Sequence, residues 1–115
     1  MAFPIPGTPR LIAPSFVGPY YAKEAPRPVT VEELQVIIRQ FGEAALRVKK
    51  AGADGVEIHA AHAHGLLGGF LSPLYTNGRC LWRDINGRLK LTLEVIAEVR
   101  KMCGKDFIID VRISG

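Results

Sequence analysis

The chain has 115 residues, of which 48% are hydrophobic and 23% charged, and fifteen basic against eleven acidic side chains give a net charge of +4. This length allows one hydrophobic core and excludes two separate domains, and no apolar run approaches the roughly 18 residues that cross a bilayer. The basic residues are scattered along the chain. Neither a membrane nor a nucleic acid is therefore an expected partner.

Residues 1–28 contain seven of the eight prolines. Each proline fixes φ and removes a backbone donor, so we predict an extended, irregular arm without a ladder of hydrogen bonds of its own. The same prolines interrupt the apolar segment that a secretory signal requires, which favours a cytoplasmic location. Cys80 and Cys103 lack the spacing of zinc ligands and are interpreted as reduced structural thiols.

A helix is predicted over residues 30–51. Thr30 and Glu33 form the T-x-x-E capping box that opens a helix, and Gly52 is a plausible stop. Apolar side chains then recur at helical spacing, which gives one face for packing on a sheet: Leu34, Ile37, Ile38, Phe41, Ala45 and Val48.

The segment DGVEIHAAH, from Asp54 to His62, contains a short buried strand at residues 55–59 that leads into a turn with two imidazoles. Residues three apart in a strand point to opposite faces. His59 and His62 therefore converge on one ligand only if the backbone leaves strand geometry just after His59. Catalytic groups of α/β proteins gather at such junctions, where a parallel strand ends.

After this strand the sequence predicts a long connection, a second helix and a second strand. Residues 60–85 form a long, Gly-rich connection of the kind that serves a site or contains short extra elements. A helix is predicted over residues 87–103, with Leu89, Leu93, Ile96, Val99 and Met102 on its apolar face and Gly104 as C-cap, and a buried strand over residues 106–114. Two strands joined through a helix should be parallel neighbours, so the chain is α/β and looks like a section of a larger sheet.

Several motifs resemble the central portion of the Old Yellow Enzyme family of NADH:flavin oxidoreductases, which includes enoate and 2,4-dienoyl-CoA reductases. They run through the chain in the family's order: IAPS, TVEEL, AGADGVEIHAAH, FLSP, Asn77-Gly-Arg79, EVIAEVR and VRIS. The resemblance implies a partial TIM (β/α)₈ barrel, with helix 3, strand 4, helix 4 and strand 5 following the irregular arm. A complete barrel needs about 250 residues.

The resemblance also implies a reaction, the reduction of activated C=C bonds of α,β-unsaturated carbonyl compounds by FMN with NAD(P)H as reductant. His59 and His62 match the two positions that hydrogen-bond the carbonyl oxygen of the enone or enoate substrate. Negative charge grows on that oxygen, and preorganised N–H donors stabilise it. Arg112, in VRIS, matches the arginine beside the flavin's pyrimidine edge, where a fixed cation favours the reduced, anionic flavin. Without the motif, a strand-end arginine in a salt bridge is an equally good interpretation of Arg112.

Two departures from the family pattern bear on activity. The tyrosine that delivers a proton in the family, two residues after the second imidazole position, is replaced here by His64, which is either a substitute acid or a solvent-exposed loop residue. In an alignment with one extra residue, Gly65 takes that place and leaves no donor. The loop after Arg79 also lacks the family's glycines. Most FMN contacts of the family lie outside this chain, so we do not expect it to be active alone.

Two other functions remain open. The cluster of His59, His62 and His64 with Glu57 predicts a metal site of the type found in barrel hydrolases. Alternatively, the chain is a non-catalytic partial barrel that folds by pairing with a second copy of itself or with a complementary barrel fragment, because buried parallel strands must be covered.

Overall fold

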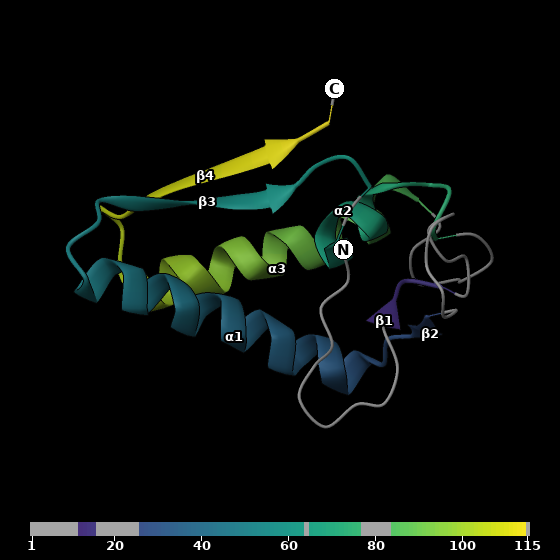
Figure 1. Ribbon diagram of the computed structural model, residues 1–115, viewed down its shortest axis with the longest axis horizontal. Helices are drawn as coiled ribbons and strands as arrows, with labels where there is room; N and C mark the ends of the chain where they lie inside the picture. Colours follow the sequence, from purple (N-terminus) through teal and green to yellow (C-terminus); the bar gives the residue numbers. More distant parts are fainter. Residues whose placement is uncertain (1–11, 16–25, 64, 77–83, 115) are drawn as a thin grey trace.

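The computed structural model describes residues 12–15, 26–63, 65–76 and 84–114. Its elements follow one another in the order β1 (Ile12–Ala13), β2 (Arg27–Pro28), α1 (Val31–Lys50), β3 (Gly55–Ala60), α2 (Gly65–Leu71), α3 (Ile85–Cys103) and β4 (Ile108–Ile113). Helices α1 and α3 pack against each other under the sheet of β3 and β4, and both strands end on the side where α2 lies (Figure 1). The chain is therefore α/β, as predicted.

Helix α1 begins and ends where its sequence signals lie. The Thr30 side chain accepts a hydrogen bond from the Glu33 backbone, and the Glu33 side chain accepts one from the Thr30 backbone, so the capping box is present. Gly52, just beyond the C-cap, has φ of 97°, a conformation that L side chains rarely adopt. Five residues of α1 are buried, namely Leu34, Ile37, Ile38, Gly42 and Ala45, whereas Val48 is 38% exposed. The predicted apolar face is thus correct except at its last residue.

Glu33 also pairs with Arg27 and so ties β2 to the first turn of α1. Arg27 Nη1 lies 2.8 Å from Glu33 Oε2, and Nη2 contacts Oε1. The hydrogen bond from Arg27 lowers the pKa of Glu33 from 4.5 to about 2, with a further contribution from the Thr30 backbone. A carboxyl whose pKa is lower in the folded state stabilises that state above the unfolded pKa and loses this contribution as the pH falls toward the folded pKa.

We therefore expect the protein to lose stability between about pH 4.5 and pH 2, and Glu33→Gln to lose less over that range. Melting temperatures of the two proteins at pH 7 and pH 3 measure the difference. Glu32→Gln, in the same helical turn, is the matched control and should keep the wild-type dependence on pH. Equal pH dependence in wild type and Glu33→Gln would contradict the role of this ion pair.

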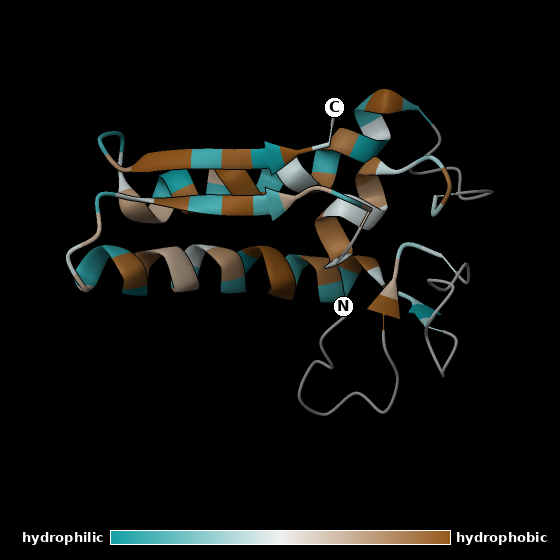
Figure 2. Ribbon diagram, turned by 45° about the horizontal axis from the view of Figure 1, so that its top comes forward, coloured by the Kyte–Doolittle hydropathy of each residue, from teal (hydrophilic) through white to brown (hydrophobic). Residues whose placement is uncertain are grey.

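The sheet of β3 and β4 is parallel and has two distinct faces. Gly55 pairs with Ile108 and His59 with Arg112 in its register. Apolar and polar residues alternate along β3 and, after two apolar residues at its start, along β4 (Figure 2). One face packs on the helices through Val56, Ile58, Ala60, Ile109 and Val111. The other face, which we call the inner face, carries Gly55, Glu57 and His59 from β3 and Ile108, Asp110 and Arg112 from β4.

Helix α3 buries a face that overlaps the predicted one in part, because Val99 is buried and Ile96 and Met102 pack against the core. Its buried residues are Leu91, Thr92, Val95, Val99 and Cys103, and Asp84 serves as N-cap. Leu93 is 58% exposed, so its assignment to the buried face was wrong. The cause is tertiary: α3 contacts α1, α2 and β4, and these neighbours select one of two apolar stripes that the helical period allows. Gly104 is the C-cap, as predicted.

The two short strands β1 and β2 depart from the sequence predictions. Strands β1 and β2 form a parallel pair, and the Val29 N–H donates to the Ala13 carbonyl, so the expectation of an arm without its own ladder was wrong. Pro28 is tolerated because a two-residue edge ladder requires few donors. Helix α2 is a short extra element within the connection of residues 60–85, as that connection's length allowed. None of the helices in the described ranges is long and apolar enough to cross a membrane.

Candidate functional site

The two imidazoles of the DGVEIHAAH segment lie close together at the carboxyl end of β3. Strand geometry ends at Ala60, and His62 and Ala63 adopt positive φ angles of 62° and 52°. This bend carries His62 back toward His59, and the two ring centroids are 6.0 Å apart with 42° between the ring planes. The bend that convergence of these two side chains requires is therefore present. The strand runs one residue further than the predicted 55–59.

The turn is held by contacts from two other elements. The His62 backbone N–H donates to Ser114 Oγ over 2.6 Å, which fixes the turn to the residue that follows β4. A Cβ on Gly68, in α2, would lie 2.8 Å from the Ala61 carbonyl oxygen, so only glycine lets the helix approach this closely. Positive φ costs free energy for residues other than glycine and persists where surrounding contacts enforce it. Ser114 and Gly68 supply such contacts.

Arg112 lies on the inner face beside His59, its partner in the β-sheet register. Its Nη2 is 3.0 Å from Glu57 Oε1 and 3.2 Å from Oε2. The salt bridge of the alternative interpretation is therefore present. Among the described residues Nε and Nη1 have no hydrogen-bond partner, and 58% of the side chain is exposed, so the guanidinium keeps donors available for a ligand.

Sequence reasoning assigned no role in the oxidoreductase site to Glu57 or Ser114. Glu57 is the one charged residue of β3, and it shares a face with His59 two positions on. This shared face could be predicted from the sequence, because side chains two positions apart in a strand point the same way. Its pairing with Arg112 and the contact from Ser114 to His62 depend on the register of β3 against β4, which the sequence did not supply.

His64, the third imidazole, lies outside the described residues, as does the Asn77-Gly-Arg79 segment with the loop that follows it. Within the described ranges no three side chains of His, Cys, Asp or Glu gather closely enough to hold a metal ion. The Glu57 carboxylate, which the metal hypothesis required, is engaged by Arg112. The described residues therefore give no support to a metal-dependent hydrolase.

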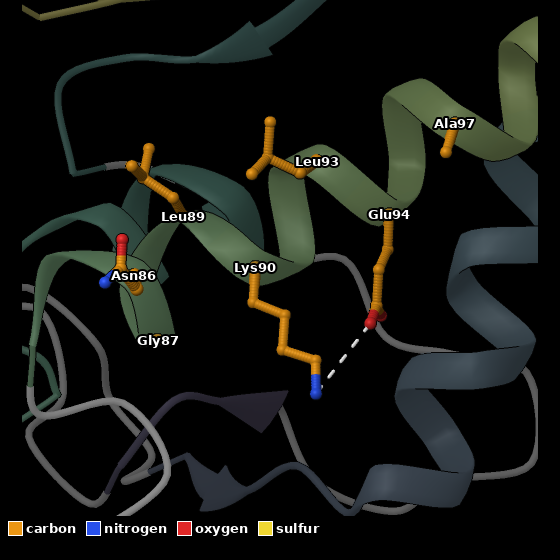
Figure 3. A pocket seen from close by; sticks show the side chains of 7 residues that line it. All are labelled: Asn86, Gly87, Leu89, Lys90, Leu93, Glu94 and Ala97. Atoms are coloured by element: carbon orange, nitrogen blue, oxygen red, sulfur yellow. Dashed lines mark ion pairs between the residues drawn. The ribbon is translucent and has the colours of Figure 1, made fainter.

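A separate open groove of about 480 Å³ runs along α3 (Figure 3). Its lining is mostly apolar, with one ion pair between Lys90 and Glu94, and comprises Asn86, Gly87, Leu89, Lys90, Leu93, Glu94 and Ala97. All seven residues belong to α3. None of the site residues His59, His62 or Arg112 lines this groove, so it is not part of the imidazole site.

Chemically, the region at the carboxyl ends of β3 and β4 presents several N–H donors beside the carboxylate of Glu57. Two imidazoles and a guanidinium meet there, and the side chains of His59, His62 and Arg112 are all exposed. Imidazole donates an N–H even when neutral, and arginine keeps its charge at any ordinary pH. This arrangement suits a ligand with oxygen or nitrogen acceptors, particularly one on which negative charge develops.

Comparison with known proteins identifies relatives of the whole described unit. The sequence model of the NADH:flavin oxidoreductase / NADH oxidase family matches residues 13–115. A cinnamate reductase of Clostridium sporogenes is 39% identical over 89 residues, which are 76% of this chain and 13% of that protein. An NADH oxidase of Thermoanaerobacter brockii is 37% identical over 105 residues, 90% of this chain and 16% of that protein.

Solved structures agree with the sequence comparison. A structure of morphinone reductase in complex with tetrahydroNAD superposes with a TM-score of 0.81 at 27% identity, and the match covers 90% of this chain and 32% of that one. The chain thus corresponds to about a third of that structure and to a smaller share of the two curated relatives.

Proposed function

The chain belongs to the NADH:flavin oxidoreductase / NADH oxidase family, and we propose that it supplies the carbonyl-binding part of an FMN-dependent enzyme that reduces activated C=C bonds of α,β-unsaturated carbonyl compounds. One observation carries this proposal: two imidazoles 6.0 Å apart lie at the carboxyl end of β3, with Arg112 next to His59 on the same face. One relative, by its name, reduces cinnamate, an α,β-unsaturated carboxylate.

His59 and His62 are the residues that would bind the substrate. Each donates one N–H to the carbonyl or carboxylate oxygen, and the pair orients the double bond by holding that oxygen at a fixed point. As charge moves onto the oxygen during reduction, these hydrogen bonds strengthen and lower the barrier. Because Ser114 and Gly68 hold the turn, the donors are placed before the substrate arrives. His64 stays the candidate for proton delivery.

The exposed donors of the inner face fit one edge of FMN. Arg112 keeps Nε and Nη1 available among the described residues, and these N–H groups match the oxygen and nitrogen acceptors of the flavin's pyrimidine edge. When bound, FMN supplies the reducing equivalents, which NAD(P)H replenishes in this family. Arg112 would hold this edge and favour negative charge on it, while His59 and His62 hold the substrate oxygen.

The open sheet supports the assignment to a barrel segment comprising helix 3, strand 4, helix 4 and strand 5. Among the described residues β3 and β4 pair only with each other, so both outer edges lack partners, and Ile108 and Ile113 are 61% and 64% exposed. Parallel sheets are ordinarily covered on both faces. A complementary barrel portion, or a second copy of the chain, would supply that cover.

The test is to produce the chain alone and together with a polypeptide that carries the remainder of a family barrel. We expect flavin absorbance and NAD(P)H-dependent reduction of cyclohexenone, or of cinnamate, from the pair. A pair that assembles and retains FMN but reduces neither compound would refute the proposed reaction. Size-exclusion chromatography reports whether the chain alone associates with itself instead.

A further inference from the structure

We propose that Glu57 positions Arg112 on the inner face and balances its charge. The two residues belong to different strands and are offset by one step along the same face, because Glu57 pairs with Asp110 and His59 pairs with Arg112. The Arg112 Nη2 donates to the Glu57 carboxylate, with distances of 3.0 and 3.2 Å to its two oxygens. One corner of the guanidinium is thereby fixed, and its other donors remain for a ligand.

Stability of the sheet does not account for this pair. Both side chains are substantially exposed, at 58% for Arg112 and 43% for Glu57, and exposed ion pairs contribute little to folding. The situation changes once a ligand or another segment covers the inner face, because a covered cation without a counter-charge is costly. Glu57 is placed to meet that need.

The neighbouring carboxylate does not serve this purpose. Asp110 lies on the same face, directly across from Glu57, but its Oδ1 accepts a hydrogen bond from the Val111 backbone 2.9 Å away. Glu57 and Asp110, which are paired across the two strands, thus have different partners. Glu57 contacts Arg112, whereas Asp110 contacts the Val111 backbone. This difference provides a matched control.

The inference rests on the proposed function for its consequence, which concerns the bound flavin. With Glu57 ionised, part of the Arg112 charge is compensated, and negative charge on the reduced flavin is stabilised less. Removal of the Glu57 charge should therefore strengthen binding of reduced FMN relative to oxidised FMN. A loss of Arg112 should have the opposite effect.

The first experiment measures the midpoint potential of FMN bound to the chain, or to the chain completed with the remainder of a barrel. We expect Glu57→Gln to raise the affinity ratio for reduced over oxidised FMN about tenfold, which makes the potential about 30 mV more positive. Asp110→Asn should change the ratio much less. A negative shift in Glu57→Gln, or equal shifts in the two variants, would overturn the proposal.

The second experiment needs no flavin. In the ¹⁵N-labelled chain, the guanidinium signals of Arg112, identified by their loss in Arg112→Lys, should show hindered rotation in wild type and Asp110→Asn and free rotation in Glu57→Ala, which removes the acceptor. Identical signals in all three proteins would overturn the proposal. If FMN binds neither to the chain alone nor to the completed barrel, the proposed function fails. The guanidinium signals then test by themselves whether Glu57 holds Arg112 in place.

Discussion

Replacement of both His59 and His62 by alanine in the completed barrel is expected to abolish the binding of carbonyl and phenolate ligands while FMN stays bound. Each imidazole supplies one N–H to the ligand oxygen, and loss of one such donor costs on the order of 3 kcal/mol in comparable sites. Loss of both leaves that oxygen without either imidazole donor. Titration with a phenol, followed by the change in flavin absorbance, measures the effect.

The control replaces His62 with asparagine, whose side-chain amide also donates an N–H. Much of the phenol affinity should survive in His62→Asn, because the donor is retained near its place and the backbone hydrogen bond to Ser114 does not depend on the side chain. Unchanged phenol affinity in the double alanine variant would refute the assignment of both histidines. Loss of FMN from that variant would show instead that the histidines hold the cofactor.

Truncation of Phe70 to alanine is expected to destabilise the protein by about 3–5 kcal/mol, a cost typical of a buried aromatic side chain. Phe70 belongs to α2 and is fully buried, at 0% exposed. Its removal leaves a cavity in the core cluster that α2 shares with β3 and α3. Because single domains are stable by only about 5–15 kcal/mol, this is a large fraction of the total. Urea denaturation followed by circular dichroism measures the change.

Leu74→Ala is the matched control for this truncation. Leu74 is an apolar residue just beyond α2 that is 69% exposed, and its truncation should change stability by less than about 0.5 kcal/mol. Similar midpoints for wild type and Phe70→Ala would show that α2 is not part of the cooperative core.

The sequence predicted the elements whose signals are local. The capping box of Thr30 and Glu33 and the helix ends near Gly52 and Gly104 depend on neighbouring residues alone, so they could be predicted directly. Helix α2 could not, because GLLGGFL has a low intrinsic preference for helix and gains its order from burial against β3 and α3. The exposure of Leu93 was missed for a related reason: periodicity identifies a helix, but only its neighbours determine which stripe is buried.

The position of the candidate site's two imidazoles at a strand end could be predicted from the sequence, whereas the contacts around them could not. The spacing of His59 and His62 at a strand end showed that their rings converge only if the backbone bends, and the structure has a bend after Ala60. The contacts from Glu57 to Arg112 and from His62 to Ser114 join residues more than fifty positions apart. They follow from the register of β3 against β4, which is set by tertiary packing.

The two faces of the sheet have different roles, one in folding and the other in the candidate site. The side that packs on α1 and α3 provides the apolar contacts of folding, whereas Glu57, His59 and Arg112 project from the other side and make no part of that core. Exchange of these polar residues therefore leaves the supporting layer intact. Such a separation allows the chemistry of a lineage to diversify by substitutions at the rim while its scaffold persists unchanged.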